Sequence, residues 1–345
     1  MKKIIISVFI IALLVTGFIA WNIFGPTLNV PEGKYYYIRT GASMETVKEN
    51  LLKEKIIRTN LWVNKVTGIL KYTKVKPGRY EIKKGMSLYK MITMLRRGEQ
   101  SIIKMVIIKE RTKELFAGKM GKKFDFEIDS LQMMNFLNSN DSLKKFDVDT
   151  NTVMAIVMPY TYLMNWNISP GKMFEQFQNA YQQFWTAERK VKADKLNLSP
   201  LQVASLASIV EEETNKKTDK YNIASTYLNR IKVGMKLQAD PTVKFAMKNF
   251  ALKRIVGVHL NTNSPFNTYM YKGIPPGPIC TPSVESINAV LDAPSTQYLY
   301  FVASSKFDGS SVFTTNFADH TRYARLYQQE LTKRIDSVKK VNANK

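Results

Sequence analysis

The amino-terminal segment of this chain is apolar over the length of a membrane span. Three polar residues interrupt the apolar run from Ile4 to Phe24, and at about 1.5 Å per residue a helix of this length crosses a bilayer core. Lys2 and Lys3 precede the run, which favours a cytoplasmic amino terminus. A cleaved signal peptide is the alternative, but its apolar region is usually shorter, and Phe18–Ala20 lacks the small-x-small cleavage pattern. We therefore predict an uncleaved, single-pass anchor at residues 1–24 in the cell inner (cytoplasmic) membrane, with the remaining chain on the periplasmic, extracytoplasmic side.

The remaining chain divides into a linker, a small module and a larger carboxyl-terminal part. Residues 25–33 have the glycine and proline content of a linker. In residues 34–100 the pattern predicts strands at 34–40 and 77–82, helices starting near Ser43 and Asn60, and a further helix at 87–97. In residues 101–345 it predicts a strand at 100–108 and helices at 174–193, 199–214, 219–233 and 318–341. Together these elements predict an α+β fold.

The helix predicted at 199–214 has a well-defined start. Ser199 can act as its N-cap, Pro200 suits the first helical position, and Gln202 completes an S-x-x-Q capping box. An apolar run follows and ends in three adjacent glutamates at residues 211–213. The sequence therefore predicts a cluster of carboxylates at the carboxyl end of this helix.

Helical spacing directs the three carboxylates to different surroundings. Glu213 follows Leu206 by seven residues and extends the apolar stripe, whereas Glu211 lies above a face of small residues and Glu212 is expected to face water. A carboxyl group on the core side of a helix end is a candidate general acid, because partial desolvation raises its pKa. The alternative interpretation is a solvated acidic helix end.

The same segment carries a family signature. A-S-I-V-E-E-E-T at residues 207–214 resembles the A-S-I-[VI]-E-x-E-T motif of the YceG/MltG-type endolytic murein transglycosylases. The likeness continues through L-N-R at 228–230, G-M at 234–235, L-Q at 237–238, D-P-T-V at 240–243, S-P-F-N-T-Y at 264–269, G-I-P-P-G-P-I at 273–279, Y-L-Y-F-V-A at 298–303 and F-T-T-N at 313–316. These blocks keep their order over more than a hundred residues, so the likeness is far more specific than a single short motif.

The resemblance implies a YceG-like catalytic domain at residues 101–345 behind a LysM-like β-α-α-β module at 34–100. LysM-like modules bind glycan chains, although such a module can also serve only as a spacer. The implied activity is that of an endolytic lytic transglycosylase. Such an enzyme cleaves the MurNAc-β-1,4-GlcNAc bond of nascent peptidoglycan strands without water and leaves 1,6-anhydroMurNAc ends, with one glutamate acting as general acid and then as base. Glu213-Thr214 is similar to the Glu-Ser pair of other lytic transglycosylases, so Glu213 is the catalytic candidate and Glu211 the second candidate.

Four further residues are candidates for the substrate cleft. Asn267 and Tyr269 belong to the S-P-[FY]-N-T-Y block, which the resemblance implies lines the cleft, and a tyrosine can both stack on a sugar and donate a hydrogen bond. Asp240 precedes a proline and is therefore expected in extended backbone, where it orients a sugar or caps the following helix. Gln238 is the fourth candidate.

The chain also departs from the family pattern. Tyr160 stands where the P-D-T-Y motif has aspartate, Met154 stands where an acidic residue usually precedes that motif, and E-R at 110–111 replaces Glu-Gly. These departures keep open a non-catalytic, membrane-anchored scaffold that only binds peptidoglycan. A hydrolytic muramidase that uses Glu213, Asp240 and water is a further alternative.

The composition limits the classes of partner that the chain is expected to bind. The net charge of +23 attracts anionic lipid, acidic polymers or nucleic acid. Nucleic acid is disfavoured, because the anchor directs the chain outward and no zinc-finger spacing or RNP-like motif occurs. The expected partners are peptidoglycan glycan strands, the cytoplasmic membrane and, as a further candidate, peptidoglycan synthases. A single cysteine excludes an intrachain disulfide, and two distant histidines do not support a metal site. No nucleotide-binding motif occurs either, so neither a metal nor a cofactor is expected.

Overall fold

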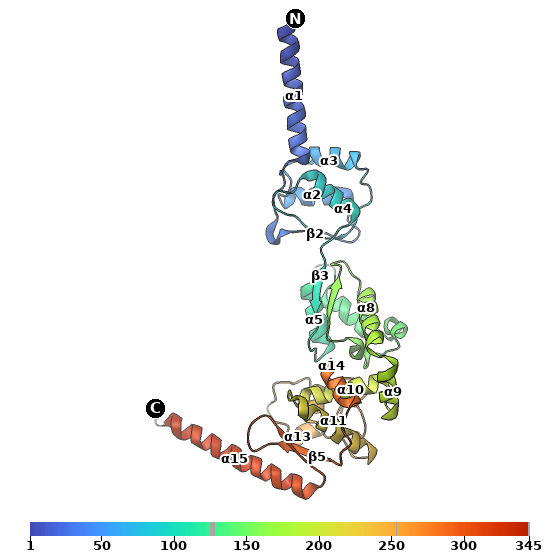
Figure 1. The fold of residues 1–345 in the computed structure, drawn as a ribbon, viewed down its shortest axis with the longest axis vertical. Coiled ribbons are helices and arrows are strands. Elements are labelled where there is room, and N and C mark those ends of the chain that lie inside the picture. The colour runs from blue at the N-terminus through green and yellow to red at the C-terminus, as the bar shows by residue number, and fades with distance from the viewer. Residues whose placement is uncertain (125–127, 253, 344–345) are drawn as a thin grey trace. The chain divides into compact units, whose positions relative to one another are not determined.

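The protein has the predicted α+β fold (Figure 1). The computed structural model describes residues 1–124, 128–252 and 254–343, so the prediction of a domain at 101–345 falls in part on residues outside this description. Among the described residues, the strands form three two-stranded sheets, β1–β2, β3–β4 and β5–β6.

The elements follow one another along the chain in a mixed order. The helices are α1 (Lys2–Phe24), α2 (Met44–Lys53), α3 (Asn60–Ile69), α4 (Leu88–Arg97), α5 (Lys113–Lys123), α6 (Ser130–Leu137), α7 (Asn140–Leu143), α8 (Pro170–Phe184), α9 (Ala187–Lys195), α10 (Pro200–Glu213), α11 (Lys217–Lys232), α12 (Asp240–Ala246), α13 (Gly257–Leu260), α14 (Val284–Leu291) and α15 (Phe317–Ala343). The strands are β1 (Tyr35–Ile38), β2 (Gly78–Glu81), β3 (Ile103–Val106), β4 (Thr161–Met164), β5 (Tyr300–Ala303) and β6 (Ser311–Thr314), and short 3-10 helices occur at η1 (Glu32–Lys34), η2 (Lys144–Phe146) and η3 (Val153–Ile156).

The chain forms two compact units, which are described separately below. Unit 1 contains Met1–Met105, Met120–Ser130 and Tyr162–Pro170, and unit 2 contains Val106–Lys119, Leu131–Thr161 and Gly171–Lys345. The predicted division between residues 100 and 101 stays a prediction.

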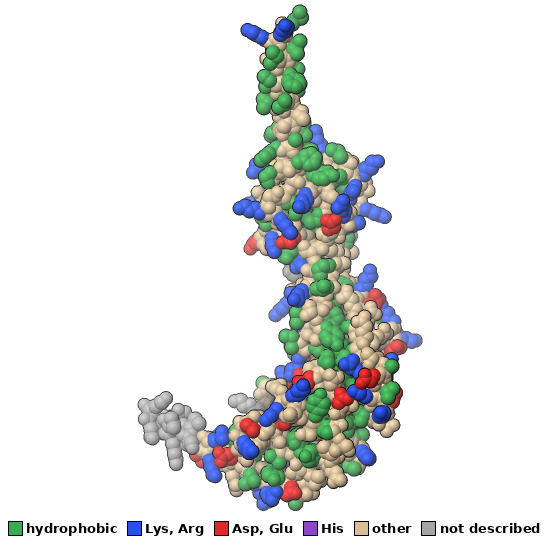
Figure 2. All heavy atoms as spheres, viewed as in Figure 1, with side chains coloured by type: hydrophobic (Ala, Val, Ile, Leu, Met, Phe, Trp, Pro, Cys, Tyr) green, Lys and Arg blue, Asp and Glu red, His purple; other side chains and the backbone are tan. Residues whose placement is uncertain are grey.

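In unit 1, α1 is apolar over most of its length after Lys2 and Lys3. Figure 2 shows hydrophobic side chains along this helix and Lys or Arg side chains at its free end. Its 23 residues give a length of about 35 Å, which exceeds a bilayer core of about 30 Å. Among the described residues, α1 is the helix that is long and apolar enough to cross a membrane.

The rest of unit 1 is built around the antiparallel pair β1–β2. Tyr36 on β1 lies opposite Tyr80 on β2, and both side chains are buried beneath α2, α3 and α4. The side chains of Ser43 and Ser87 accept hydrogen bonds from the backbone of α2 and α4, respectively, and Gly98 ends α4 with φ 72°. These helix starts and the helix end are as predicted, because capping serines and a terminal glycine are strong local signals. The likeness to a LysM module stays a prediction.

In unit 2, α10 lies against α9, α11, α12 and α14. The predicted capping box is confirmed, with hydrogen bonds of 2.9 Å from Ser199 N to Gln202 Oε1 and 3.2 Å from Gln202 N to Ser199 Oγ. All residues from Val203 to Val210 are buried. The predicted helix is therefore confirmed as a core helix that ends in the carboxylate cluster.

Two predicted elements differ from the structure. The single helix predicted at 174–193 is wrong, because the chain forms α8 and α9 with a break at Thr186. This residue has extended backbone, and its side chain accepts a hydrogen bond from Arg189 N at 3.4 Å, so it starts a new helix. The strand predicted at 100–108 is shorter, since β3 covers Ile103–Val106.

Candidate active site

Glu213, the last residue of α10, directs its carboxylate toward α11. The Tyr227 hydroxyl on α11 donates a hydrogen bond to Glu213 Oε1 at 2.6 Å. Tyr227 is 1% exposed, whereas Glu213 is partly exposed and lines a pocket of about 610 Å³. The carboxylate is therefore held by an interior group on one side, while its residue borders space that a ligand can enter.

The surroundings of Glu213 raise the pKa of its carboxyl to about 7. Burial is the main cause, and the negative charge of Asp240 acts in the same direction. The hydrogen bond from Tyr227 and the positive charges of Arg230 and Lys244 oppose this shift and only partly offset it. A carboxyl with a pKa near neutrality can both deliver and accept a proton, which general acid-base catalysis requires.

A second carboxylate, that of Asp240, belongs to the same electrostatic cluster. The Tyr269 hydroxyl donates a hydrogen bond of 2.7 Å to Asp240 Oδ1. The expectation of extended backbone at Asp240 is wrong, because this residue is the first of α12, and Ala239 is the N-cap. The capping role is also not seen, since α12 has no side-chain cap. The side chain of Asp240 instead accepts a hydrogen bond from a predicted cleft residue.

Asn267 organises the loop that carries Tyr269. It is fully buried, and its Nδ2 donates to the carbonyl oxygens of Leu260 and Thr262 at 2.9 and 2.8 Å. Its Oδ1 accepts a hydrogen bond of 3.0 Å from Tyr269 N. This placement differs from the expectation that Asn267 lines the cleft, because its amide is already bonded to the backbone.

Gln238 lies on the connection between α11 and α12. Its side chain is exposed, its φ is 51°, and its backbone N–H donates to Thr268 O at 3.2 Å. This left-handed conformation is uncommon for a residue other than glycine. The backbone contact places Gln238 beside the segment that carries Asn267 and Tyr269.

Glu211 lies among strong donors. Its Oε2 accepts hydrogen bonds from Ser283 and Ser286 hydroxyls at 2.5 Å each and from Lys220 Nζ at 3.0 Å. Burial alone raises the pKa of a carboxyl, but these hydrogen bonds and the charge of Lys220 outweigh it, so the pKa of Glu211 is lowered. Because Ser283 is also the N-cap of α14, Glu211 connects three helices.

Glu212 does not face water as expected. Its side chain is 12% exposed and forms ion pairs of 3.0 Å with Arg111 Nη2 and 3.1 Å with Lys109 Nζ. These three residues line the same pocket as Glu213. Among the described residues, no group of His, Cys, Asp and Glu has the arrangement of a metal site.

Two of the positions that depart from the family pattern, Met154 and Tyr160, are filled by packing residues, whereas the third, Arg111, pairs with Glu212. Met154 is 6% exposed and lies in η3, and Tyr160 packs against the core that surrounds α10. Burial raises the pKa of Tyr160. Glu110 is 8% exposed and pairs with Lys119 at 2.5 Å.

Sequence reasoning did not assign the contacts that Tyr227 and Arg230 make. Both lie on α11, three residues apart and so on one face. Besides acting on Glu213, Arg230 donates from Nε to Leu299 O at 2.6 Å and from Nη1 to Leu237 O at 2.5 Å. The sequence signal available was the three-residue spacing of Tyr227 and Arg230, which places them on one face of a helix. This spacing does not reveal which other helix that face contacts.

The chain is similar to known proteins of one family. A model of the YceG-like family matches residues 36–326. A relative from Bacillus subtilis (strain 168), named endolytic murein transglycosylase, is 28% identical over 313 residues, covering 84% of this chain and 83% of the relative. A protein of the same name from Streptococcus pneumoniae serotype 2 is 23% identical over 325 residues, covering 86% of this chain but 57% of the relative.

A solved structure supports the fold. The crystal structure of a putative yceG-like protein from Listeria monocytogenes superposes with a TM-score of 0.54 at 23% sequence identity, covering 84% of this chain and 99% of that one. At this identity the likeness concerns the fold alone. Since the family model spans most of the sequence, the chain belongs to the YceG-like family.

Proposed function

We propose that this protein is a lytic murein transglycosylase that cleaves peptidoglycan glycan strands. Membership of the YceG-like family and two relatives named endolytic murein transglycosylase support this activity. The observation that carries it within the chain is Glu213, a carboxyl that burial brings to a pKa of about 7 beside a pocket.

In the proposed mechanism, Glu213 acts twice. Its protonated carboxyl first donates to the oxygen of the MurNAc-β-1,4-GlcNAc bond, and the bond between that oxygen and C1 of MurNAc breaks. The resulting carboxylate then accepts the proton of the MurNAc C6 hydroxyl, whose oxygen attacks C1. The products are a GlcNAc 4-hydroxyl and a 1,6-anhydroMurNAc end, and no water is consumed.

Neighbouring residues prepare Glu213 for both steps. Tyr227 holds one carboxylate oxygen, while Arg230 and Lys244 limit the rise of the Glu213 pKa. We assign Asp240 and Tyr269 to the sugar-binding side and Asn267 to positioning Tyr269 through its backbone. The exposed side chain of Gln238 is the third proposed substrate contact. Glu211 stays the second catalytic candidate, although its lowered pKa makes it a poor proton donor.

We further propose that residues 1–24 form a transmembrane anchor, 25–33 a linker, 34–100 a LysM-like module and 101–345 the catalytic domain. The charge at the start of α1 supports a cytoplasmic amino terminus and a catalytic domain outside the inner membrane. A groove of about 580 Å³ in unit 1 is lined by Tyr37, which is 38% exposed and whose ring packs 5.1 Å from that of the buried Trp166. An exposed tyrosine ring can stack on a sugar, so this groove is the proposed glycan contact of the module.

The anchor also supports cleavage within nascent strands. A catalytic domain tethered to the membrane can reach strands near their lipid-linked ends, where peptidoglycan synthases add new units. We therefore propose endolytic cleavage, with these synthases as partners.

Incubation of the full-length protein in detergent with purified sacculi tests the function. Mass spectrometry should find 1,6-anhydroMurNAc ends, and chromatography should find long fragments before disaccharides. Reducing MurNAc ends labelled from ¹⁸O water would instead identify a hydrolytic muramidase. The absence of any new ends, with sacculi still bound, would identify a scaffold.

A further inference from the structure

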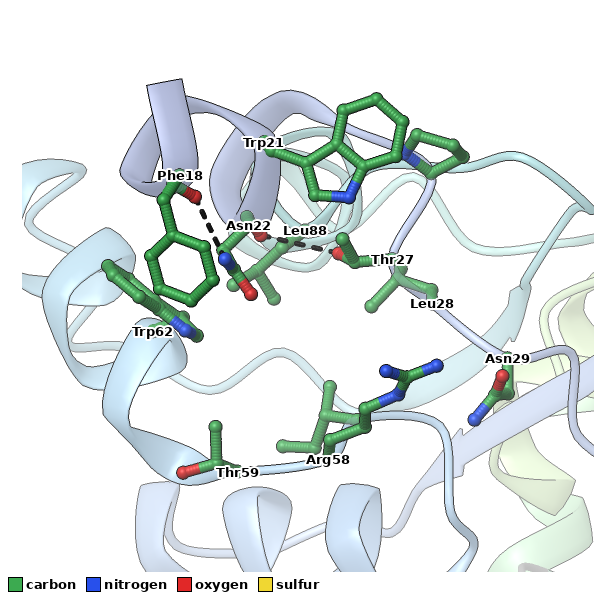
Figure 3. Close-up of a pocket in the computed structure, with 12 residues that line it drawn as sticks. Phe18, Trp21, Asn22, Thr27, Leu28, Asn29, Arg58, Thr59, Trp62 and Leu88 are labelled. Atoms are coloured by element: carbon green, nitrogen blue, oxygen red, sulfur yellow. Dashed lines mark hydrogen bonds between the residues drawn. The ribbon is translucent and has the colours of Figure 1, made fainter. Parts of the chain in front are cut away.

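A pocket lies where α1 meets the small module of unit 1 (Figure 3). It has a volume of about 400 Å³ and is lined by Phe18 and Trp21 from α1, by Arg58 and Trp62 at the start of α3, and by Leu88 from α4. Figure 3 shows the ring of Trp62 beside that of Phe18 and the guanidinium group of Arg58 extending into the open space. The pocket therefore combines aromatic walls with one cationic group.

The end of α1 is firmly packed on the module. Ile23 is 8% exposed and belongs to the same core as Tyr36 and Tyr80. The Phe18 and Trp62 rings are 6.0 Å apart, and those of Phe24 and Tyr89 are 5.2 Å apart. Because α1 is about 5 Å longer than a bilayer core is thick, about one turn at its end reaches the headgroup region. The adjoining face of the module then lies at the same level.

The outer face of α3 has the composition of a membrane-interface helix. Leu61 and Ile69 are 55% and 72% exposed, and Lys65 Nζ lies 5.6 Å from the centre of the Trp62 ring. Exposed aliphatic side chains beside tryptophan and lysine are typical of helices that lie at the level of lipid headgroups. This face continues the exposed apolar surface of α1, which includes Phe18 and Trp21.

We propose that the face formed by the end of α1 and by α3 docks on the leaflet at which α1 ends, and that Arg58 binds the phosphate of an anionic phospholipid there. The proposal rests on α1 being the transmembrane anchor. Arg58 is exposed, and no ion pair joins it to a carboxylate within the described part of the chain. An arginine matches the planar geometry of phosphate oxygens. The small module is thereby fixed at the membrane surface, independently of glycan binding.

The test uses the full-length protein in vesicles of phosphatidylcholine and phosphatidylglycerol. An environment-sensitive fluorophore is attached at Leu61→Cys. The matched control is Thr46→Cys, an exposed residue that lines the other groove of the module and not this pocket. The unmodified chain gives the labelling background, since its single cysteine, Cys280, is buried. Quenching by lipids that carry a nitroxide near the headgroup is then measured.

We expect strong quenching at position 61 and little at position 46. A nitroxide on phosphatidylglycerol should associate about fivefold more than one on phosphatidylcholine, as for a single cation near an anionic surface. Arg58→Gln should abolish this preference, whereas Lys53→Gln, in the other groove, should retain it.

Equal quenching at positions 61 and 46 would overturn the docking surface, and a lipid preference unchanged by Arg58→Gln would overturn the phosphate site. Release of the protein from the vesicles would refute the anchor on which both rest. Cleavage of sacculi by the same preparation is assayed separately, so loss of docking and failure of the proposed enzymatic function are distinguishable.

Discussion

Glu211 and Glu213 are two residues apart on one helix, yet their surroundings give them opposite properties. Glu211 accepts hydrogen bonds from two serines and Lys220, and its pKa is lowered. Glu213 accepts one hydrogen bond from a buried tyrosine, and its pKa is raised to about 7. The difference shows that the balance between burial and the donors around a carboxylate, and not its distance from the helix end, sets the direction in which its pKa shifts.

The largest expected effect concerns the proton itself. Glu213→Gln keeps the size and the hydrogen bond from Tyr227 but removes the titrating group, so cleavage should fall about 10²–10⁴-fold. Glu211→Gln should lose far less cleavage activity per folded molecule. Initial rates of anhydro-end formation from sacculi, normalised to folded protein, measure both. A larger loss in Glu211→Gln would reverse the two assignments.

The second effect concerns the free energy of unfolding, which substitution of Glu211 should change more than substitution of Glu213. Glu211→Ala leaves Lys220, whose side chain is 5% exposed, with Glu285 at 3.4 Å as its remaining ion-pair partner and a hydrogen bond of 3.5 Å to Ser283 Oγ. Loss of one partner of a buried ion pair should lower the free energy of unfolding by about 3 kcal/mol. Glu213→Gln should cost little or increase stability, because it removes a carboxyl whose ionisation its surroundings disfavour.

Denaturant unfolding of both variants in the same detergent measures this difference. The double variant Glu211→Met/Lys220→Met provides the control, since removing both charges should restore much of the stability. Equal destabilisation by Glu211→Ala and Glu213→Gln would contradict the proposed division between a structural and a catalytic carboxylate.

The two carboxylates should also differ in their response to pH. The folded pKa of Glu213 lies above its ordinary value of 4.5. Its contribution to stability is therefore present below about pH 4.5 and is lost as the pH rises through about 7, a change of about 3 kcal/mol. The lowered pKa of Glu211 has the opposite sign, since its contribution is present above 4.5 and is lost as the pH falls through its folded pKa.

Activity gives the more direct measurement of the Glu213 pKa. Because the first step needs a protonated Glu213, kcat/KM should fall above about pH 7. The hydrogen bond from Tyr227 lowers the Glu213 pKa, so Tyr227→Phe should move this alkaline limb to higher pH. A limb that stays in place or moves to lower pH would show that another group controls it.

The contrast also marks what the sequence can predict. The helix starts at Ser43, Ser87 and Ser199 depend on neighbours within one turn, so they were predicted correctly. The apolar stripe that ends at Glu213 was visible for the same reason. Hydrogen bonds from Tyr227 to Glu213, and from Ser283 to Glu211, join segments 14 and 72 residues apart. Helical periodicity contains no information on such pairings. The same holds for the ion pairs of Glu212 with Lys109 and Arg111, so the expected exposure of Glu212 was wrong.

Breaks within a helical pattern were also difficult to predict. Thr186 interrupts the run that the sequence assigned to one helix, because a threonine can face outward within a helix or cap the next one. Asp240 shows the same ambiguity beside a proline. Its side chain bonds to Tyr269 across 29 residues, so tertiary contact decides its role.

The smallest expected effect is on kcat. It distinguishes the role of the Asp240 charge from the role of the hydrogen bond that positions Asp240. Tyr269→Phe keeps the aromatic ring and the negative charge but removes the 2.7 Å hydrogen bond. A lost hydrogen bond of about 1 kcal/mol corresponds to about a fivefold fall in kcat, with KM little changed. The alkaline limb should stay near its original pH, because the charge that raises the Glu213 pKa is still present.

Asp240→Asn is the matched variant, since it removes that charge and should move the alkaline limb to lower pH. Steady-state kinetics on soluble glycan strands, measured across pH, distinguish the two variants. If Tyr269→Phe instead raises KM and leaves kcat unchanged, the Tyr269 hydroxyl binds the sugar directly. Its hydrogen bond to Asp240 then forms only when no substrate is bound.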